Sequence, residues 1–337
     1  MINWKIKRRL MLKKYLLYGI YGCLLTLGAC NKDEEAVSPS YLDRNWFVIS
    51  DKPGEFNQLA YSIYTETGIP IFVNDTLGEE NYATDAEGRP IYRTETFNLS
   101  YILFGSTVEQ SSAGTTRYIV QSSDTVAMIK AATLLRDRVI PFLPKTGEYR
   151  PKCYFMVDSL NDYCVVATWL GYDYVELPNE PAYAAMKGVV VGQLCDINNM
   201  DDAAIDLWCG RIIAVKIAKW LTNDEVIDLS DWYAITDEGK KSGSYYGQDY
   251  DSYYDEFEYN MLDSAGMFGW YAENEQYRCT YEQERDVFEY VARVYAYRGK
   301  EEEFLSEYAG KDKVCRKFNL MQEYVTKFEE KFNIKIK

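Results

Sequence analysis

The sequence changes character at residues 200–221, which read MDDAAIDLWCGRIIAVKIAKWL. This long, largely apolar segment predicts a helix, and Asp201 and Asp202 lie at its start, where the helix dipole favours negative charge. Before this segment, the patterns of strands and helices alternate, whereas after it the patterns are mainly those of helices. The sequence therefore predicts an α+β fold with a strand-rich N-terminal part and a helical C-terminal part.

The N-terminal part contains two predicted helices and several predicted strands. Apolar residues recur at helical spacing from Phe56 to Ile63, and a second amphipathic pattern over residues 124–140 ends before Pro141. Residues 75–89 are rich in Gly, Asp and Asn, which predicts a loop. Strand patterns cover residues 69–74, 95–103, 117–121, 154–158, 165–170 and 187–195.

Two more helices are predicted in the C-terminal part. Residues 280–283, Thr-Tyr-Glu-Gln, match a capping box and predict a helix that ends near Arg298. Apolar residues spaced by four and three over residues 314–332 predict a terminal helix with one buried face. Residues 236–265 are rich in Tyr, Asp and Gly, which predicts irregular structure. No internal repeat or proline-rich linker interrupts residues 45–337, so we expect a single domain there.

The composition excludes several functional classes. The 337 residues carry a net charge of −15, which disfavours nucleic-acid binding because phosphate recognition needs a basic face. The 14 Phe, 7 Trp and 31 Tyr are too much aromatic area for a disordered chain. The chain has no histidine, so Ser–His and Cys–His nucleophile pairs and imidazole metal ligands are excluded.

The first 29 residues have the pattern of an export signal. Six basic residues and no acidic one lie within residues 1–14, and an apolar run too short to span a bilayer then ends in Leu-Gly-Ala-Cys30. This ending resembles the lipobox of bacterial lipoproteins, which implies that residues 1–29 are removed and that the Cys30 thiol is lipidated. The alternative is a simple secretory signal with a chance cysteine, and Met11 is a second candidate for the start of translation.

Residues 30–44 are predicted to tether the domain to a membrane. The run Asn31-Lys32-Asp33-Glu34-Glu35 resembles the surface-export signal of Bacteroidota lipoproteins. This resemblance implies a lipid-anchored protein of the outer membrane that faces outward. The alternative interpretation is an ordinary solvated tether.

Three passages resemble the zinc-binding metallopeptidases that occur as Bacteroidota lipoproteins beside nutrient-import systems. The first is the lipobox followed by Tyr-Leu-Asp-Arg-Asn-Trp (41–46) and the strand Ile-Pro-Ile-Phe-Val (69–73). The second is Gly-Met-Phe-Gly-Trp-Tyr-Ala (266–272), and the third is Arg-Asp-Val-Phe-Glu-Tyr-Val (285–291). The resemblance implies a zincin-like fold for residues 45–337.

The metal-binding motif of that family is missing. Where the family has His-Glu-x-x-His, this chain has Val215-Lys216-Ile217-Ala218-Lys219, which offers neither metal ligands nor a general base. In the third passage Arg285 replaces a glutamate, whereas Asp286 and Glu289 are retained. The resemblance therefore implies a degenerate site without zinc. One expectation is a salt bridge from Lys216 or Lys219 to Asp286 or Glu289; the alternative is that both lysines lie on a solvated helix face.

Aromatic residues beside acidic ones suggest ligand binding. Residues 245–259 are the most biased segment, and their tyrosines could bind sugars or basic peptides or could simply pack onto the domain. The resemblance implies a cleft beside the helix that carries Lys216, and Trp270 and Tyr271 are its candidate ligand-binding residues. The preferred hypothesis is a non-catalytic accessory or binding protein of nutrient uptake that binds a peptide or glycan and has an outer-membrane import complex as its candidate partner. The alternatives are a metallohydrolase with a carboxylate-bound metal at Asp286 and Glu289, and a purely structural surface protein.

Overall fold

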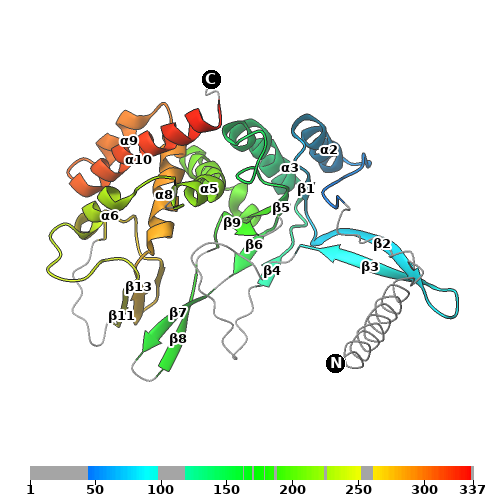
Figure 1. Cartoon of the computed structure of the whole chain (residues 1–337), viewed down its shortest axis with the longest axis horizontal. Helices are drawn as coiled ribbons and strands as arrows, with labels where there is room; N and C mark the ends of the chain where they lie inside the picture. Colours follow the sequence, from blue (N-terminus) through cyan, green and yellow to red (C-terminus); the bar gives the residue numbers. More distant parts are fainter. Residues whose placement is uncertain are drawn as a thin grey trace, which may run out of the picture. The chain divides into compact units, whose positions relative to one another are not determined.

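The computed structural model describes residues 45–97 and 118–334, apart from 162, 169–170, 178, 186–187, 224–225 and 252–260. Residues 46–337 make up one compact unit, drawn in Figure 1. The predicted signal segment and the predicted tether, including Cys30, lie outside the described residues. Within the described part of the chain, no helix combines the length and the apolar character needed to cross a membrane.

A mixed four-stranded sheet forms the centre of the N-terminal part. Its strands, in spatial order, are β1 (Ile71–Phe72), β5 (Tyr154–Met156), β10 (Gly188–Val191) and β9 (Ala182–Ala185). The first three strands are parallel, and β9 pairs antiparallel with β10 at the edge of the sheet. Alternate residues enter two separate cores, as the two-residue period of a strand requires: Tyr154 and Met156 face one core, and Phe155 faces the other.

Two helical segments accompany this sheet, as the sequence predicts. Helix α2 (Glu55–Thr67) ends at Gly68, whose φ of 75° is the left-handed conformation typical of a helix stop. Helix α3 (Thr125–Leu134) begins at Asp124, which accepts hydrogen bonds from two backbone N–H groups. The segment continues through a π turn (Leu135–Val139) and a 3₁₀ turn (Ile140–Phe142), so helical structure runs past Pro141 instead of stopping before it.

Helices dominate the C-terminal part, again as predicted. They are α5 (Asp202–Leu221), α6 (Ser230–Asp237), α7 (Met261–Ser264), α8 (Gln283–Ala296), α9 (Glu301–Glu307) and α10 (Asp312–Lys331). The short helix α4 (Leu194–Ile197) precedes them, where the end of the strand at 187–195 was predicted, and α7 lies in the segment that was predicted to be irregular. The apolar side chains of the predicted terminal helix are buried in α10 from Val314 to Phe328.

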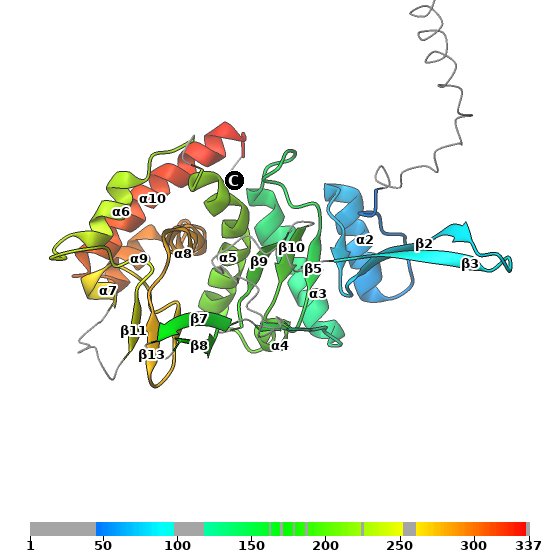
Figure 2. The same cartoon turned by 60° about the horizontal axis from the view of Figure 1, so that its bottom comes forward.

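Helices α5 and α8 lie side by side at very short range (Figure 2). A Cβ atom added at Gly210 of α5 would lie 2.1 Å from the carbonyl oxygen of Ala292 in α8. Because glycine has no side chain, the two helix backbones can come into contact here. This close contact brings the neighbouring side chains of α5 within reach of α8.

Short sheets of two or three strands complete the fold. They are β2 (Thr76–Thr84) with β3 (Pro90–Thr96), β4 (Tyr118–Val120) with β6 (Ser159–Asn161), β7 (Tyr163–Thr168) with β8 (Gly171–Glu176), and β11 (Asp249–Asp251) with β13 (Tyr277–Cys279) and β12 (Ala272–Glu273). The prediction of a loop at 75–89 was wrong, because much of it belongs to the β2–β3 hairpin. Of the strand predicted at 95–103, only residues 95–97 are described, and β3 ends at Thr96; the rest lies outside the described residues.

The predicted helix after Thr280 is present, but its predicted capping box is not. The hydroxyl of Thr280 accepts a hydrogen bond from the backbone N–H of Gln248, at 2.8 Å, instead of capping the helix. The N-cap is Glu282, and its side chain makes no capping hydrogen bond. The threonine therefore joins the segment before β11 to the segment before α8.

Candidate functional site

Glu289 of α8 lies at the centre of a buried cluster of arginines. It is fully buried and accepts hydrogen bonds from Arg285 Nη2 at 2.8 Å and from Arg293 Nη1 at 2.6 Å. Both arginines lie four residues from it on the same helix, so one helix face carries all three side chains. Arg211 Nη2 of α5 adds a third contact at 3.1 Å. The close approach of α5 at Gly210 brings Arg211 to this carboxylate.

These arginines keep Glu289 ionised. Burial by itself would raise the pKa of this carboxyl group, because the charged form loses its hydration. The positive charges of Arg211, Arg285 and Arg293 outweigh burial, so the pKa of Glu289 lies well below its usual range. The carboxylate is therefore charged at every pH at which the protein would normally operate.

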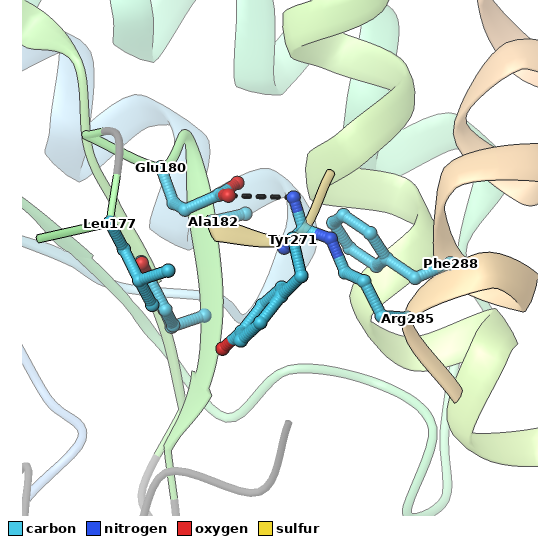
Figure 3. Close-up of a pocket in the computed structure, with 7 residues that line it drawn as sticks. Leu177, Glu180, Ala182, Tyr271, Arg285 and Phe288 are labelled. Atoms are coloured by element: carbon cyan, nitrogen blue, oxygen red, sulfur yellow. Dashed lines mark hydrogen bonds and ion pairs between the residues drawn. The ribbon is translucent and has the colours of Figure 1, made fainter. Parts of the chain in front are cut away.

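Arg285 extends this cluster to a pocket beside the sheet. Its Nη2 atom also donates to Oε1 of Glu180, at 2.6 Å, and Figure 3 shows this pair beside the ring of Tyr271. The pocket is lined by Leu177, Glu180, Ala182, Tyr183, Tyr271, Arg285 and Phe288. Its cavity of about 20 Å³ holds one water-sized group.

Buried polar atoms of the pocket include Oε2 of Glu180 and Nε of Arg285, and neither of these two atoms has a hydrogen-bond partner among the described residues. A buried acceptor and a buried donor without partners are costly, so such atoms usually meet a ligand or an ordered water. The pocket can therefore accept a small polar group that both donates and accepts hydrogen bonds.

The outer edge of β9 lies beside this pocket and is covered, although no described strand pairs with it. In an antiparallel ladder, hydrogen-bonded pairs alternate with pairs that are not hydrogen-bonded. The N–H of Gly192 donates to the carbonyl of Pro181, so Tyr183 and Ala185 of β9 also belong to hydrogen-bonded pairs with β10. Ala182 and Ala184 lie between these pairs, and their N–H and C=O groups must therefore point away from β10. Both alanines are buried, at 5% and 1% exposure, and the described residues supply no strand that pairs with this edge.

A second buried ion pair lies one helical turn away, between Asp286 of α8 and Lys317 of α10. Lys317 Nζ lies 2.5 Å from Asp286 Oδ2, and neither side chain is exposed. The hydroxyl of Tyr246 donates to the same oxygen at 2.7 Å, and the ammonium lies 4.3 Å from the ring centroid of Trp232. Burial raises the pKa of Asp286 and lowers the pKa of Lys317, because it disfavours both charges.

The predicted salt bridges from Lys216 and Lys219 were wrong. Within the described residues, Asp286 pairs with Lys317, and Glu289 pairs with the three arginines. Lys219 is exposed and Lys216 is half-buried, with a pKa lowered by burial and by the charge of Lys219. The physical reason is helix phase: the α5 side chain that faces Glu289 is Arg211, one turn before Val215, and Val215 itself is fully buried in the core.

The sequence interpretation missed four residues of these clusters. Arg293 could have been found, because Arg285, Glu289 and Arg293 follow one another at intervals of four. Arg211, Glu180 and Lys317 lie on other segments, and no local pattern in the sequence pairs them with α8.

The residues around Glu289 do not fit a zinc ion. Zinc needs lone-pair donors, whereas the groups that surround this carboxylate are guanidinium cations. Asp286, the other acid of the suggested carboxylate site, is held by an ammonium. Among the residues that the structure describes, no three Cys, Asp or Glu side chains are grouped so that they could hold a metal.

The two aromatic candidates differ in their surroundings. Tyr271 lines the pocket, and its ring centroid lies 5.9 Å from the guanidinium carbon of Arg285. Trp270 instead packs edge-on against Tyr250, with ring centroids 5.7 Å apart, and Arg278 lies over its ring at 5.6 Å. Of the tyrosine-rich segment, Tyr246 is buried, and residues 252–260 lie outside the described residues.

Comparison with known proteins gives no match, whether to a protein-family model, a curated protein or a solved structure.

Proposed function

We propose that this chain is a non-catalytic binding protein with a degenerate zincin-like fold. In this proposal it is anchored through Cys30 to the outer membrane, faces outward and serves nutrient uptake as a component of an import complex. The observation that carries the proposal is the arginine cluster at Glu289. Guanidinium groups hold the carboxylate that, by the resemblance, would lie at the metal site, so the chain has kept the acid while losing what a metal requires.

The packing of α5 against α8 supports the proposed lineage. The resemblance assigns the missing metal motif to residues 215–219 and the retained acids to residues 285–291, so these two segments must be neighbours. Helices α5 and α8 touch at Gly210 and Ala292, and Arg211 bridges them to Glu289. Segments far apart in space would have argued against the resemblance.

A peptide is the ligand that the geometry favours. Nε of Arg285 is a buried donor without a hydrogen-bond partner among the described residues, and it lies in the pocket beside Tyr271, where it suits an oxygen atom of a peptide. A glycan would instead need an open aromatic face, and the ring of Trp270 already packs against Tyr250 and Arg278. We therefore propose that a peptide is bound at the Arg285 pocket.

A mixed hexapeptide library tests this proposal against both alternatives. The purified protein should retain peptides without shortening them, and a chelator should not change retention, because no metal takes part. Arg285→Gln removes the guanidinium from the pocket and should weaken retention, whereas Lys219→Gln, at an exposed position of α5, is the control. Chelator-sensitive cleavage would favour the metallohydrolase, and the absence of any retained peptide would favour the purely structural protein.

A further inference from the structure

The Arg285 pocket offers one hydrogen-bond acceptor and one hydrogen-bond donor that no described residue uses. The acceptor is Oε2 of Glu180, and the donor is the Nε–H group of Arg285. Other atoms hold both side chains in place, since Nη2 of Arg285 lies 2.6 Å from Oε1 of Glu180. An acceptor and a donor that are buried in this way are costly when both stay unpaired. The pair therefore indicates a ligand group that satisfies both atoms.

The cavity limits that group to the size of a water molecule. Its volume is about 20 Å³, and a cavity needs roughly 10–15 Å³ to hold one water. Leu177, Ala182 and Phe288 form apolar parts of its wall, and all three are buried. A carboxamide or a guanidinium group is too large for this space, so the two polar atoms must be satisfied by a single ligand atom and its hydrogen.

A hydroxyl group is the chemistry that meets both requirements. Its O–H can donate to Oε2 of Glu180 while its oxygen accepts from Nε of Arg285. A carbonyl oxygen cannot donate, an ammonium cannot accept, and a carboxylate would place a second negative charge beside Oε2. The charge of Arg285 is already compensated by two carboxylates, those of Glu180 and Glu289, which favours a neutral group.

We propose that the Arg285 pocket binds the hydroxyl group of a serine or threonine side chain in the captured peptide. This inference rests on the proposed function, because it names which peptides the same pocket selects. Among the residues that line the pocket, Tyr271 and Arg285 alone are partly exposed, and Figure 3 shows them side by side. The side chain therefore enters between these two residues, and the peptide backbone stays outside the cavity.

The single place in the pocket favours a peptide over a sugar. Serine and threonine carry one hydroxyl group on a short apolar arm, which matches one water-sized space with Leu177 and Phe288 in its wall. A sugar ring carries several hydroxyl groups, and the cavity has room for one of them.

Three pools of hexapeptides that differ at one fixed position test this proposal. The fixed residue is serine in the first pool, 2-aminobutyrate in the second, where a methyl group replaces the hydroxyl, and aspartate in the third. The other positions are random but contain no serine, threonine or tyrosine. Titration of the folded protein with each pool measures binding. The serine pool should bind about tenfold more tightly than either of the others, because only a hydroxyl satisfies both buried atoms.

Two variants locate this preference, which is measured as the ratio of the serine and aminobutyrate affinities. Arg285→Lys keeps a positive charge beside Glu180 but removes the Nε donor. Glu180→Gln keeps the size of the side chain and places an N–H donor where Oε2 stood. In each variant the two pools should bind alike. Lys219→Gln, at an exposed position of α5, is the control and should keep the full ratio. Circular dichroism shows whether each variant is folded.

The outcomes separate this inference from the proposed function. If the serine and aminobutyrate pools bind the wild type equally, the cavity holds an ordered water only and the hydroxyl proposal is wrong, while peptide capture stands. The proposal is also overturned if the aspartate pool binds most tightly, or if folded Arg285→Lys keeps the full ratio. If no peptide pool binds, the proposed function itself fails, and binding of a mixed oligosaccharide pool would then assign the pocket to a glycan.

Discussion

Two buried carboxylates lie three residues apart on α8, and their surroundings differ. Asp286 meets a single ammonium, that of Lys317, and both side chains are fully enclosed. Glu289 meets three guanidinium groups, and the side chains of Arg285 and Arg211 remain 15% and 23% exposed. The pKa of Asp286 is raised, because burial dominates, whereas the pKa of Glu289 is lowered, because the arginines dominate. The first cluster is closed to ligands, and the second retains contact with its pocket.

The closed cluster should show the largest effect on stability. Lys317→Met leaves Asp286 buried without its cation, which should lower the free energy of unfolding by about 3–5 kcal/mol. Chemical denaturation followed by tryptophan fluorescence measures this change. The double variant Lys317→Met with Asp286→Leu should recover most of the loss, because it also removes the uncompensated charge. A double variant as unstable as the single one would mean that packing, and not charge, causes the loss.

The open cluster should show a smaller effect with a distinct pH dependence. Glu289→Gln should cost about 2–3 kcal/mol, because its arginines are partly solvated and Arg285 keeps Glu180. In the wild type, the folded pKa of Glu289 lies below the unfolded value, so its contribution is complete above about pH 4.3 and is lost as the pH falls towards the folded pKa. The variant should lack this acid-dependent loss. Unfolding measured between pH 3 and pH 6 checks the difference, and parallel pH profiles would contradict it.

The smallest effect is expected at the residue that the sequence had suggested as a partner of these acids. Lys216→Ala should change the free energy of unfolding by less than about 1 kcal/mol, because Lys216 forms no ion pair with either carboxylate in the described part of the chain. Denaturation at neutral pH measures this, with Lys219→Ala as the exposed control on the same helix. A loss of 3 kcal/mol or more in Lys216→Ala would instead indicate that Lys216 forms a buried ion pair, as the sequence had suggested.

Local pattern was enough to predict the longer helices and three residues of the site, whereas the short helices α4, α6, α7 and α9 were not predicted. The regular spacing of apolar residues predicts α2, α5 and α10, and the resemblance over residues 285–291 brought Arg285, Asp286 and Glu289 together. These predictions succeed because they depend on neighbours one turn apart on one helix.

The rest depends on contacts between distant segments. Glu289 pairs with Arg211, which lies 78 residues away in the sequence, and Asp286 pairs with Lys317, which lies 31 residues away. Helix periodicity does not encode which face of α5 meets α8. The β2–β3 hairpin was missed for another reason. Its turn residues dominate the composition of residues 75–89, and most of β3 is exposed, so the hairpin gives no apolar alternation.

The contact at Gly210 supplies a signature for finding relatives of this chain. The signature is a Gly-Arg pair on one helix, followed later in the sequence by an Arg-x-x-x-Glu-x-x-x-Arg helix. The glycine has no side chain, so the two helices pack closely and the arginine beside it reaches the glutamate of the second helix. Lipobox-bearing sequences that lack His-Glu-x-x-His can be searched for this combination. If the proposed relation to zincins is right, chains that carry this combination have arginines where the metal would have been the counter-ion of the glutamate.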